Sequence, residues 1–334
     1  MNNFVFAEPR TFDEAAAMLA DKKYSLPVLK GGGIDLIDHL KEGLVEPDVI
    51  INIRRIRATN APIARTNGTP QGLRIEATTT LAEIAASPDV RAVCPVLAQA
   101  VEWAASPQVR NVATAAGNLL QRPRCWYYRH EQYHCLKKGG AMCYAVEGEN
   151  MYHAVFGDGP CHIVHPSNLA PALMVCNAVV HVSGAGRAEI PIARLFHTPN
   201  KDVLTENTLK PGEVVTHITC DAAPASGFYA VKEKQSFDWP LVAASVSLKL
   251  EGTKITGARL CAGAVAPVPW ALPKAEEALR GIAVDDDAAL RRACALSTEG
   301  ALPMTDNAYK LKLLPVAVRR AILIAAGRGA EVEA

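Results

Sequence analysis

The sequence predicts a mixed α+β protein of two domains or three. Its 334 residues are 49% hydrophobic and 21% charged, which supplies ample apolar material for a globular core. Helix-capping signals and strand patterns follow one another along the chain. A change in composition at Ala222-Ala-Pro-Ala-Ser-Gly227 marks a boundary between two parts. We therefore predict one domain over residues 1–224 and a second over residues 225–330.

The charge balance and the N-terminus limit the classes of partner. With 35 Lys and Arg against 34 Asp and Glu, the net charge of +1 gives no broad basic field for nucleic acid. No apolar run approaches the roughly 20 residues that span a bilayer. Met1-Asn-Asn-Phe-Val-Phe-Ala-Glu8 lacks the regions of a secretory signal, so we expect assembly in the cytoplasm and no structural disulfides. Small molecules and other proteins are the expected partners.

Local signals in the first half predict both helices and strands. Thr11 and Glu14 form a capping-box pattern, in which each side chain accepts from a free N–H group, and predict a helix through Ala20. Thr80 and Glu83 predict a second helix in the same way. A third helix-like segment covers Val93–Ala105. Strand patterns cover Tyr24–Leu29, Val49–Ile53 and Leu73–Ala77.

The second half contains further strands and ends in a helix. Ala178–Val182 alternates like a half-buried strand and precedes a turn at residues 183–186. Leu313–Ala326 predicts an amphipathic helix that starts or kinks at Pro315 and stops at Gly327. Between them we predict two strands and a helix, Ala243–Leu250, Thr256–Val265 and Pro273–Arg280.

Two stretches of small residues are candidates for ligand loops. Lys30-Gly-Gly-Gly-Ile-Asp-Leu36 follows a predicted strand, and three glycines allow backbone N–H groups to approach a phosphate closely. It is neither a Walker loop nor the Gly-x-Gly-x-x-Gly fingerprint, so a plain tight turn stays open as the alternative. Ala113-Thr-Ala-Ala-Gly-Asn118 offers a hydroxyl, an amide and bare backbone. The two loops suit one elongated ligand, or they are two unrelated turns.

Four of the nine cysteines lie within 37 residues, at Cys125, Cys135, Cys143 and Cys161. Their spacing, Cys-x9-Cys-x7-Cys-x17-Cys, matches neither the paired cysteines of structural zinc sites nor the close spacing of bacterial ferredoxins. Zinc and an iron–sulfur cluster both stay open, and nearby histidines also allow a mixed zinc site. The other five cysteines are scattered singly and are expected in the core. Residues 122–164 read as an insertion into a ligand-binding domain.

Four motifs of the first part carry a resemblance to a known family: Lys30–Leu36, Ile75–Ile84, Arg110–Leu119 and Pro166–Leu173. Taken in order, they resemble the FAD-binding subunit of the xanthine dehydrogenase/molybdenum hydroxylase family. In the second part, Gln235-Ser-Phe-Asp238 and Ala262–Trp270 are similar to the C-terminal flavoprotein domain of that family.

The resemblance implies a two-subdomain FAD-binding fold of the vanillyl-alcohol oxidase type, followed by an α+β flavoprotein domain. FAD would lie between the subdomains. Three positions depart from the family pattern: Ile34 replaces Thr, Ala116 replaces Gly and Asn168 replaces Asp. Lys232 and Lys234 lie where the family often has a basic residue near the flavin, and a solvated surface charge is the alternative for both. The implied flavin contacts are Lys30, Gly31, Gly32, Gly33, Ile34, Asp35, Leu36, Ala113, Thr114, Gly117, Asn118, Asn168, Leu169 and Lys232.

The insertion is similar to the cluster-bearing loop of 4-hydroxybenzoyl-CoA reductase β subunits and aldehyde oxidoreductase flavoprotein subunits. The resemblance implies a [4Fe–4S] cluster on Cys125, Cys135, Cys143 and Cys161. It further implies an electron-transfer subunit whose partners are a large molybdenum-cofactor subunit, a small [2Fe–2S] subunit and ferredoxin or another carrier. A heterotrimer or a dimer of heterotrimers is expected, and export to the periplasm with a partner is the alternative location.

Two other functions stay open. One is an assembly subunit with structural zinc and no redox role, and the other is a self-sufficient flavin enzyme. The direction of electron flow is not fixed by the sequence.

Overall fold

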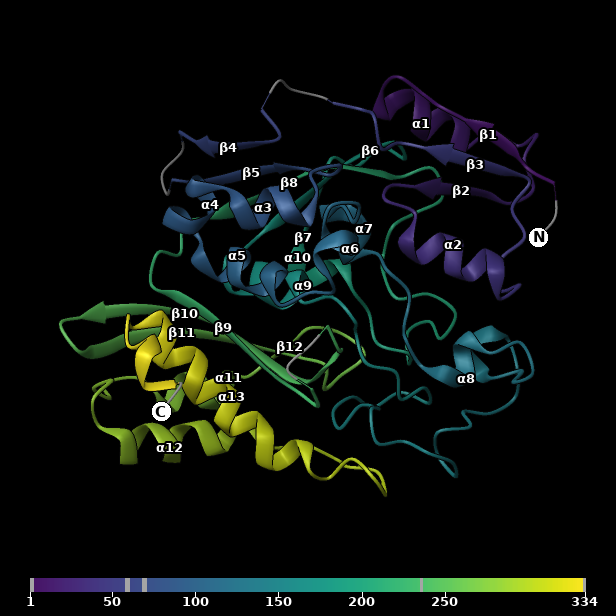
Figure 1. Cartoon of the computed structure of the whole chain (residues 1–334). Coiled ribbons are helices and arrows are strands. Elements are labelled where there is room, and N and C mark those ends of the chain that lie inside the picture. The colour runs from purple at the N-terminus through teal and green to yellow at the C-terminus, as the bar shows by residue number, and fades with distance from the viewer. Residues whose placement is uncertain (1–2, 58–60, 68–70, 235–236, 333–334) are drawn as a thin grey trace.

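The computed structural model describes residues 3–57, 61–67, 71–234 and 237–332 (Figure 1). The described residues form a parallel sheet of order β1-β3-β2 and two antiparallel sheets, β4-β5-β8-β6-β7 and β12-β11-β10-β9. The strands are β1 (Val5–Ala7), β2 (Pro27–Lys30), β3 (Val49–Asn52), β4 (Ile63–Thr66), β5 (Gly72–Glu76), β6 (Val179–Ser183), β7 (Glu189–Pro191), β8 (Val214–Asp221), β9 (Ser226–Lys232), β10 (Pro240–Glu251), β11 (Lys254–Gly263) and β12 (Trp270–Ala271).

Helices pack between and around these sheets (Figure 1). Within the described ranges, none of them is long and apolar enough to cross a membrane. They are α1 (Phe12–Leu19), α2 (Ile34–Lys41), α3 (Leu81–Ala86), α4 (Pro88–Val93), α5 (Pro95–Glu102), α6 (Pro107–Arg110), α7 (Ala115–Leu119), α8 (Trp126–Arg129), α9 (Leu169–Val175), α10 (Ile192–Leu195), α11 (Pro273–Ala278), α12 (Asp287–Ala295) and α13 (Lys310–Ala325). Short 3₁₀ helices are η1 (Leu136–Lys138), η2 (Leu296–Thr298) and η3 (Gly329–Val332).

The parallel sheet positions the glycine loop. β2 pairs with β3 in parallel, with Val28 opposite Ile50, and every residue of β3 is buried. At the end of β2 the chain turns through Gly33, whose φ of +86° is accessible mainly to glycine, and enters α2 directly. The loop therefore lies at the carboxyl end of a strand and at the N-terminus of a helix.

Both predicted helix starts are confirmed. Thr80 and Glu83 form the full capping box: the Thr80 hydroxyl accepts the Glu83 N–H at 3.1 Å, and the Glu83 carboxylate accepts the Thr80 N–H at 2.7 Å. At α1 the Thr11 hydroxyl accepts the Glu14 N–H at 3.1 Å. There the Glu14 carboxylate binds the N–H of Arg10 instead of that of Thr11.

Two predicted helices have different limits in the structure. The segment Val93–Ala105 is not one helix, because α4 ends at Val93 and Pro95, which has no N–H to donate, starts α5. The C-terminal helix begins at Lys310, so Pro315 lies inside it. Gly327, with φ of +76°, ends it as predicted.

Two hydrophobic cores share the C-terminal sheet between them. Successive strand residues face opposite sides, so Ala243 packs into the core of the first part while Val242 and Ala244 pack into the second core. α5 and α9 contact this sheet from the first core, and α13 contacts β9 and β10. Figure 1 shows α5 and α9 between the sheets and α13 on the outer side. The domain limits 1–224 and 225–330 stay a prediction.

The singly spaced cysteines are all buried, as predicted, but three of them lie close to each other. The Cys94 Sγ lies 4.0 Å from that of Cys220, and Cys94 also shares a hydrogen bond with Cys176. They come from the start of α5, the end of α9 and β8. Chain spacing gives no sign of this group, because it forms only when the sheet and helices pack.

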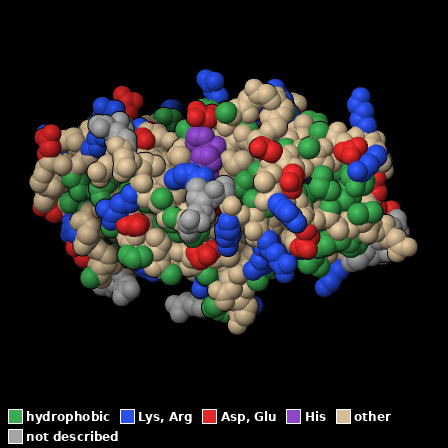
Figure 2. Space-filling model, turned by 90° about the horizontal axis from the view of Figure 1, so that it is seen from above, with side chains coloured by type: hydrophobic (Ala, Val, Ile, Leu, Met, Phe, Trp, Pro, Cys, Tyr) green, Lys and Arg blue, Asp and Glu red, His purple; other side chains and the backbone are tan. Residues whose placement is uncertain are grey.

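The surface mixes charges of both signs. Figure 2 shows Lys and Arg interspersed with Asp and Glu on the face seen from above. This face carries no broad field of one sign, in agreement with the near-neutral net charge.

Candidate functional site

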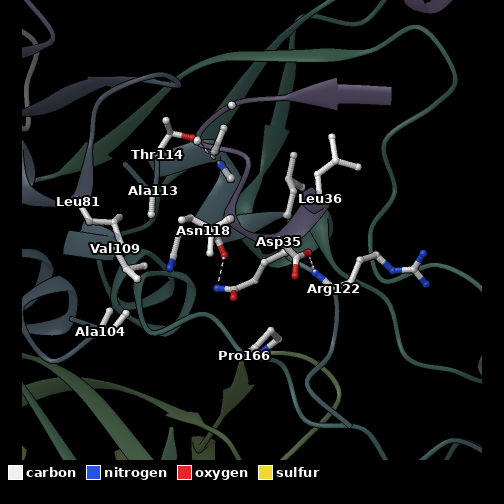
Figure 3. A pocket seen from close by; sticks show the side chains of 18 of the residues that line it. Asp35, Leu36, Leu81, Ala104, Val109, Ala113, Thr114, Asn118, Arg122 and Pro166 are labelled. Carbon is white, nitrogen blue, oxygen red and sulfur yellow. Dashed lines mark hydrogen bonds between the residues drawn. The ribbon is translucent and has the colours of Figure 1, made fainter. Parts of the chain in front are cut away.

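A cavity of about 420 Å³ lies between the parallel sheet, α7 and the start of β10 (Figure 3). One wall is made by the glycine loop, Lys30–Leu36, and by Ala113, Thr114, Gly117 and Asn118 of the second small-residue loop. The opposite wall includes Pro166 and residues 237–240. The structure thus brings together two loops that lie about 80 positions apart in the chain.

The two loops contact each other so closely that glycine is required. A Cβ atom added at Gly32 would lie 2.3 Å from the carbonyl oxygen of Val112, and one added at Gly31 would lie 2.8 Å from the Thr114 hydroxyl. A side chain at either position would push the loops apart. The glycines therefore allow the close approach of two backbones and leave the cavity side of the loop bare.

The glycine loop presents free N–H groups. No acceptor among the described residues takes the N–H of Gly31, Gly32 or Gly33. α2 follows with Gly33 as its N-cap and with no side-chain cap, so its first N–H groups and the positive end of its dipole also face this region. Free N–H groups at a helix N-terminus form an anion site.

The second loop is fixed by its own hydrogen bonds. The Thr114 hydroxyl accepts the Gly117 N–H at 3.2 Å and caps α7. The Ser167 hydroxyl donates to the Asn118 side-chain oxygen at 2.6 Å, and Gln121 donates to the Asn118 carbonyl at 3.0 Å. These bonds connect the loop to the segment that begins α9.

Three of the other predicted flavin contacts differ in their position relative to the cavity. Asn168 lines it and donates to the Ala100 carbonyl at 3.4 Å. Leu169 does not line it, because its side chain is buried in the core at the start of α9. Lys232 lies behind the wall: its Nζ donates to the Trp103 carbonyl at 2.7 Å, and Trp103 lines the cavity. Lys234 is exposed.

The departures from the family pattern cause no disruption. Ile34 lines the cavity mouth and is 42% exposed. Ala116 is buried, and its N–H donates to the Ala77 carbonyl at 3.0 Å. Gln235 and Ser236 of the C-terminal motif lie outside the described residues.

A second cavity, of about 250 Å³, shares a wall with the first. Arg124, Asn168 and Trp239 line both, and the Arg124 guanidinium lies 4.9 Å from the centre of the Trp239 ring. Cys125 and His153 lie on another side of the second cavity. The same two residues also line a third, small cavity in the inserted segment.

All four predicted metal-binding cysteines line this third cavity. The Cys143 and Cys161 thiols share a hydrogen bond, which lowers the pKa of Cys143 to about 5 and raises the pKa of Cys161. Burial raises the pKa of Cys125 to about 11, and its sulfur lies 3.3 Å from Nε2 of His153. Within the described residues, no group of three or more His, Cys, Asp or Glu is arranged to hold one metal ion.

Several aromatic rings contact one another in the segment that carries the cysteines. The Tyr127 ring lies 5.1 Å from that of Tyr133 and 6.0 Å from that of Tyr144, and Trp126 contacts Tyr127 and His153. Of these rings, Tyr127 and Tyr144 line the cavity itself.

Two charged residues beside the cysteines were not predicted. Lys137, in η1 between Cys135 and Cys143, is buried and forms an ion pair of 2.6 Å with the buried Glu206. A lysine among loop residues reads as solvated from the sequence, and Glu206 lies far along the chain. No sequence pattern connects them.

Comparisons with known proteins identify the family to which this fold and its two-loop cavity belong. Residues 2–220 match the FAD binding domain in molybdopterin dehydrogenase, and residues 227–325 match the CO dehydrogenase flavoprotein C-terminal domain. The first match covers more than half of the chain. The chain therefore belongs to the family of FAD-binding medium subunits of molybdenum hydroxylases and CO dehydrogenases, and it is an oxidoreductase subunit.

Relatives and solved structures agree with this assignment. The aldehyde oxidoreductase FAD-binding subunit PaoB of Escherichia coli (strain K12) is 31% identical over 281 residues, which are 82% of this chain and 86% of that protein. The carbon monoxide dehydrogenase medium chain of Afipia carboxidovorans is 26% identical and covers 96% of each chain. A crystal structure of the Cu,Mo-CO dehydrogenase in its cyanide-inactivated form superposes with a TM-score of 0.74 over 98% of this chain and 99% of that one, at 24% identity. The predicted fold class is thereby confirmed.

Proposed function

We propose that this chain transfers electrons within a molybdenum-containing hydroxylase, dehydrogenase or reductase complex, between an FAD in the 420 Å³ cavity and a [4Fe–4S] cluster on the four inserted cysteines. The single observation that carries the proposal is the order of the three cavities. The first shares Arg124, Asn168 and Trp239 with the second, and the second shares Cys125 and His153 with the third. A redox centre at each end would thus be separated by one short, aromatic-lined space.

The first cavity offers groups that would hold a dinucleotide. The free N–H groups of Gly31, Gly32 and Gly33, together with the N-terminus of α2, would hold the pyrophosphate. The Cβ of any other residue at Gly32 would fill the space that the loops use to approach each other. Asp35 places a carboxylate near this anion site, but arginines pair with it and offset its charge. When bound, FAD exchanges two electrons with one partner and single electrons with iron–sulfur clusters.

The third cavity offers the donor set of a cluster. Cys125, Cys135, Cys143 and Cys161 supply four sulfurs and no carboxylate lines the space, which suits iron–sulfur ligation. Four thiolates also suit one structural zinc ion, so the identity of the metal is decided by measuring iron and zinc in the purified chain.

Electron transfer at this site requires partner subunits. Relatives are named medium chains, for example in carbon monoxide dehydrogenase and glyceraldehyde dehydrogenase, which places those proteins in larger assemblies. We infer a large molybdenum-cofactor subunit and a small [2Fe–2S] subunit here as well, in a heterotrimer or a dimer of heterotrimers. Substrate chemistry takes place on the molybdenum subunit, and ferredoxin or another carrier exchanges electrons with the complex. Assembly in the cytoplasm stays a prediction.

The test is to measure flavin, iron and zinc in the anaerobically purified chain. We expect about one FAD and four irons per chain, with absorbance near 400 nm that bleaches on reduction. Cys135→Ser loses the iron and keeps the FAD. Cys294→Ser is the matched control, because Cys294 is a buried thiol in the C-terminal core, and it keeps both. Stoichiometric zinc without iron would refute the cluster and leave a structural zinc subunit.

A further inference from the structure

The Asp35 carboxylate, at the start of α2, contacts the inserted segment and not the flavin cavity alone. One oxygen accepts the backbone N–H of Arg122 at 2.8 Å (Figure 3). The other accepts from Arg129 at 2.6 Å and lies 3.0 Å from Nη2 of Arg124. The Asp35 side chain is only 20% exposed. Three residues of the insertion thus converge on one carboxylate, which lies two positions after Gly33.

Arg129 transmits this contact to the first cysteine. Its guanidinium donates to the Pro123 carbonyl at 2.7 Å, to the Arg122 carbonyl at 3.0 Å and to Asp38 at 2.7 Å, besides its bond to Asp35. Its own N–H donates to the Cys125 carbonyl at 2.9 Å. With the side chain 12% exposed, Arg129 fixes the start of α8, where Cys125 lies.

A second carboxylate extends the network to the next cysteine. Glu206 lies 2.9 Å from Nε of Arg122 and 2.6 Å from Nζ of Lys137. Lys137 follows Cys135 by two residues and also donates to the Val203 carbonyl at 2.9 Å. A network of ion pairs and hydrogen bonds therefore runs from α2 to the segments that carry Cys125 and Cys135, with Arg122 joining Asp35 through its backbone N–H and Glu206 through its guanidinium.

We propose that Asp35 is a positioning residue that couples the two ligand sites: an anion bound at the start of α2 orders this helix, and Asp35 transmits that order to Cys125 through Arg129. The coupling rests on the proposed function for the identity of its ligands. Coupling between two binding sites is reciprocal. FAD binding stabilises the arrangement of the cysteines that binds the cluster, and that arrangement tightens FAD binding by the same factor.

The charge state of Asp35 agrees with this role. Burial alone would raise the pKa of Asp35, but Arg124 and Arg129 outweigh burial and hold it below its usual value. The carboxylate is therefore ionised at neutral pH. It also accepts a charge-assisted hydrogen bond from the Arg129 guanidinium, whose other terminal nitrogen donates to Asp38, and these two bonds fix the orientation of Arg129.

The test measures thiol protection in the full-length, metal-free chain, so it does not depend on activity. N-ethylmaleimide is added with and without FAD, and the modification rates of Cys125 and Cys135 are followed by peptide mass spectrometry. In the wild type we expect FAD to slow modification about 5- to 150-fold, the usual range of coupling between sites. In Asp35→Asn we expect FAD to slow the modification of these cysteines by no more than about twofold. The variant binds FAD more weakly than the wild type, so FAD is added at a saturating concentration.

Two further acidic residues serve as comparisons. Asp89→Asn removes an exposed carboxylate that pairs with Arg65 on the surface, and it keeps the wild-type protection. Asp38 lies on the same helix as Asp35 and also pairs with Arg129, but its side chain is 48% exposed. We therefore expect Asp38→Asn to lose part of the thiol protection by FAD. We expect Arg129→Gln to lose the thiol protection by FAD to the same extent as Asp35→Asn. The double variant should lose no more protection than either single variant, because both substitutions remove the same ion pair.

The outcomes separate a coupling role from a structural one. If Asp35→Asn raises the modification rate equally with and without FAD, Asp35 only stabilises the fold and the coupling is refuted. If the wild type binds FAD and iron but FAD gives no thiol protection, the coupling fails while the proposed function stands. If the wild type binds no FAD, both fail.

Discussion

Gly32 provides the sharpest test of the two-loop cradle, through the substitution Gly32→Ala. The added Cβ would lie 2.3 Å from the Val112 carbonyl oxygen, 2.9 Å from its carbon and 3.1 Å from Cα of Ala113. All three are backbone atoms, so no flexible side chain can yield. Ordinary contact begins at 3.4 Å, and the loops must therefore separate by about 1 Å.

This separation sets the size of the effect. Overpacking a well-packed site costs about 1–3 kcal/mol. If the loops relax apart in the free chain, FAD must bring them together again, and its Kd rises by about 5- to 150-fold. Gly32 has no positive φ, so the substitution adds no backbone strain to this cost.

The assay is a titration of the apoprotein with FAD, followed by flavin fluorescence, with a melting curve for each variant. Gly257→Ala is the matched control, because the nearest atom to its added Cβ belongs to the flexible Lys249 side chain at 3.5 Å and it has no positive φ. We expect wild-type affinity in the control. An FAD affinity for Gly32→Ala within twofold of wild type, at an unchanged melting temperature, would refute the cradle.

Two further predictions concern stability. Thr80→Ala removes the hydroxyl that accepts the Glu83 N–H at the start of α3 and should lower the free energy of unfolding by about 1 kcal/mol in urea titrations; no change would show that this cap contributes nothing. His165 is buried, and burial lowers its pKa to about 3. Between pH 6.5 and 3 it therefore stays neutral in the folded chain, whereas it is protonated in the unfolded chain. As pH drops from 6.5 to 3, His165 should therefore lower the free energy of unfolding by up to about 1.4 kcal/mol per pH unit. Above pH 6.5, His165 should make no contribution to the pH dependence. His165→Gln should show a shallower slope over that range, and identical slopes would contradict the assignment.

The parts of the site that the sequence predicts are those with local causes. The triple glycine follows a strand and precedes a helix, and each of these signals lies within a few residues of the next. The capping box at Thr80 and Glu83 is equally local. The cysteines are close enough in the chain for a common ligand to be inferred, and the structure brings them to one cavity.

The remaining features depend on contacts between distant segments. Asp35 and Arg129 are 94 positions apart, and an aspartate next to a glycine loop is more readily assigned to the ligand than to an inserted segment. β8, which pairs with both β5 and β6, was missed because its polar residues interrupt the apolar pattern. The proximity of Cys94, Cys176 and Cys220 likewise arises only from packing.

Electron exchange between the flavin cavity and the four cysteines can be measured directly in one chain. A chain loaded with FAD and iron is given one electron by pulse reduction, without a mediator, and the flavin and cluster absorbances are followed in time. We predict that both absorbances change together as the electron distributes between the sites, and that Cys135→Ser shows the flavin change alone. Two centres that are both present and that equilibrate only when a mediator is added would contradict it.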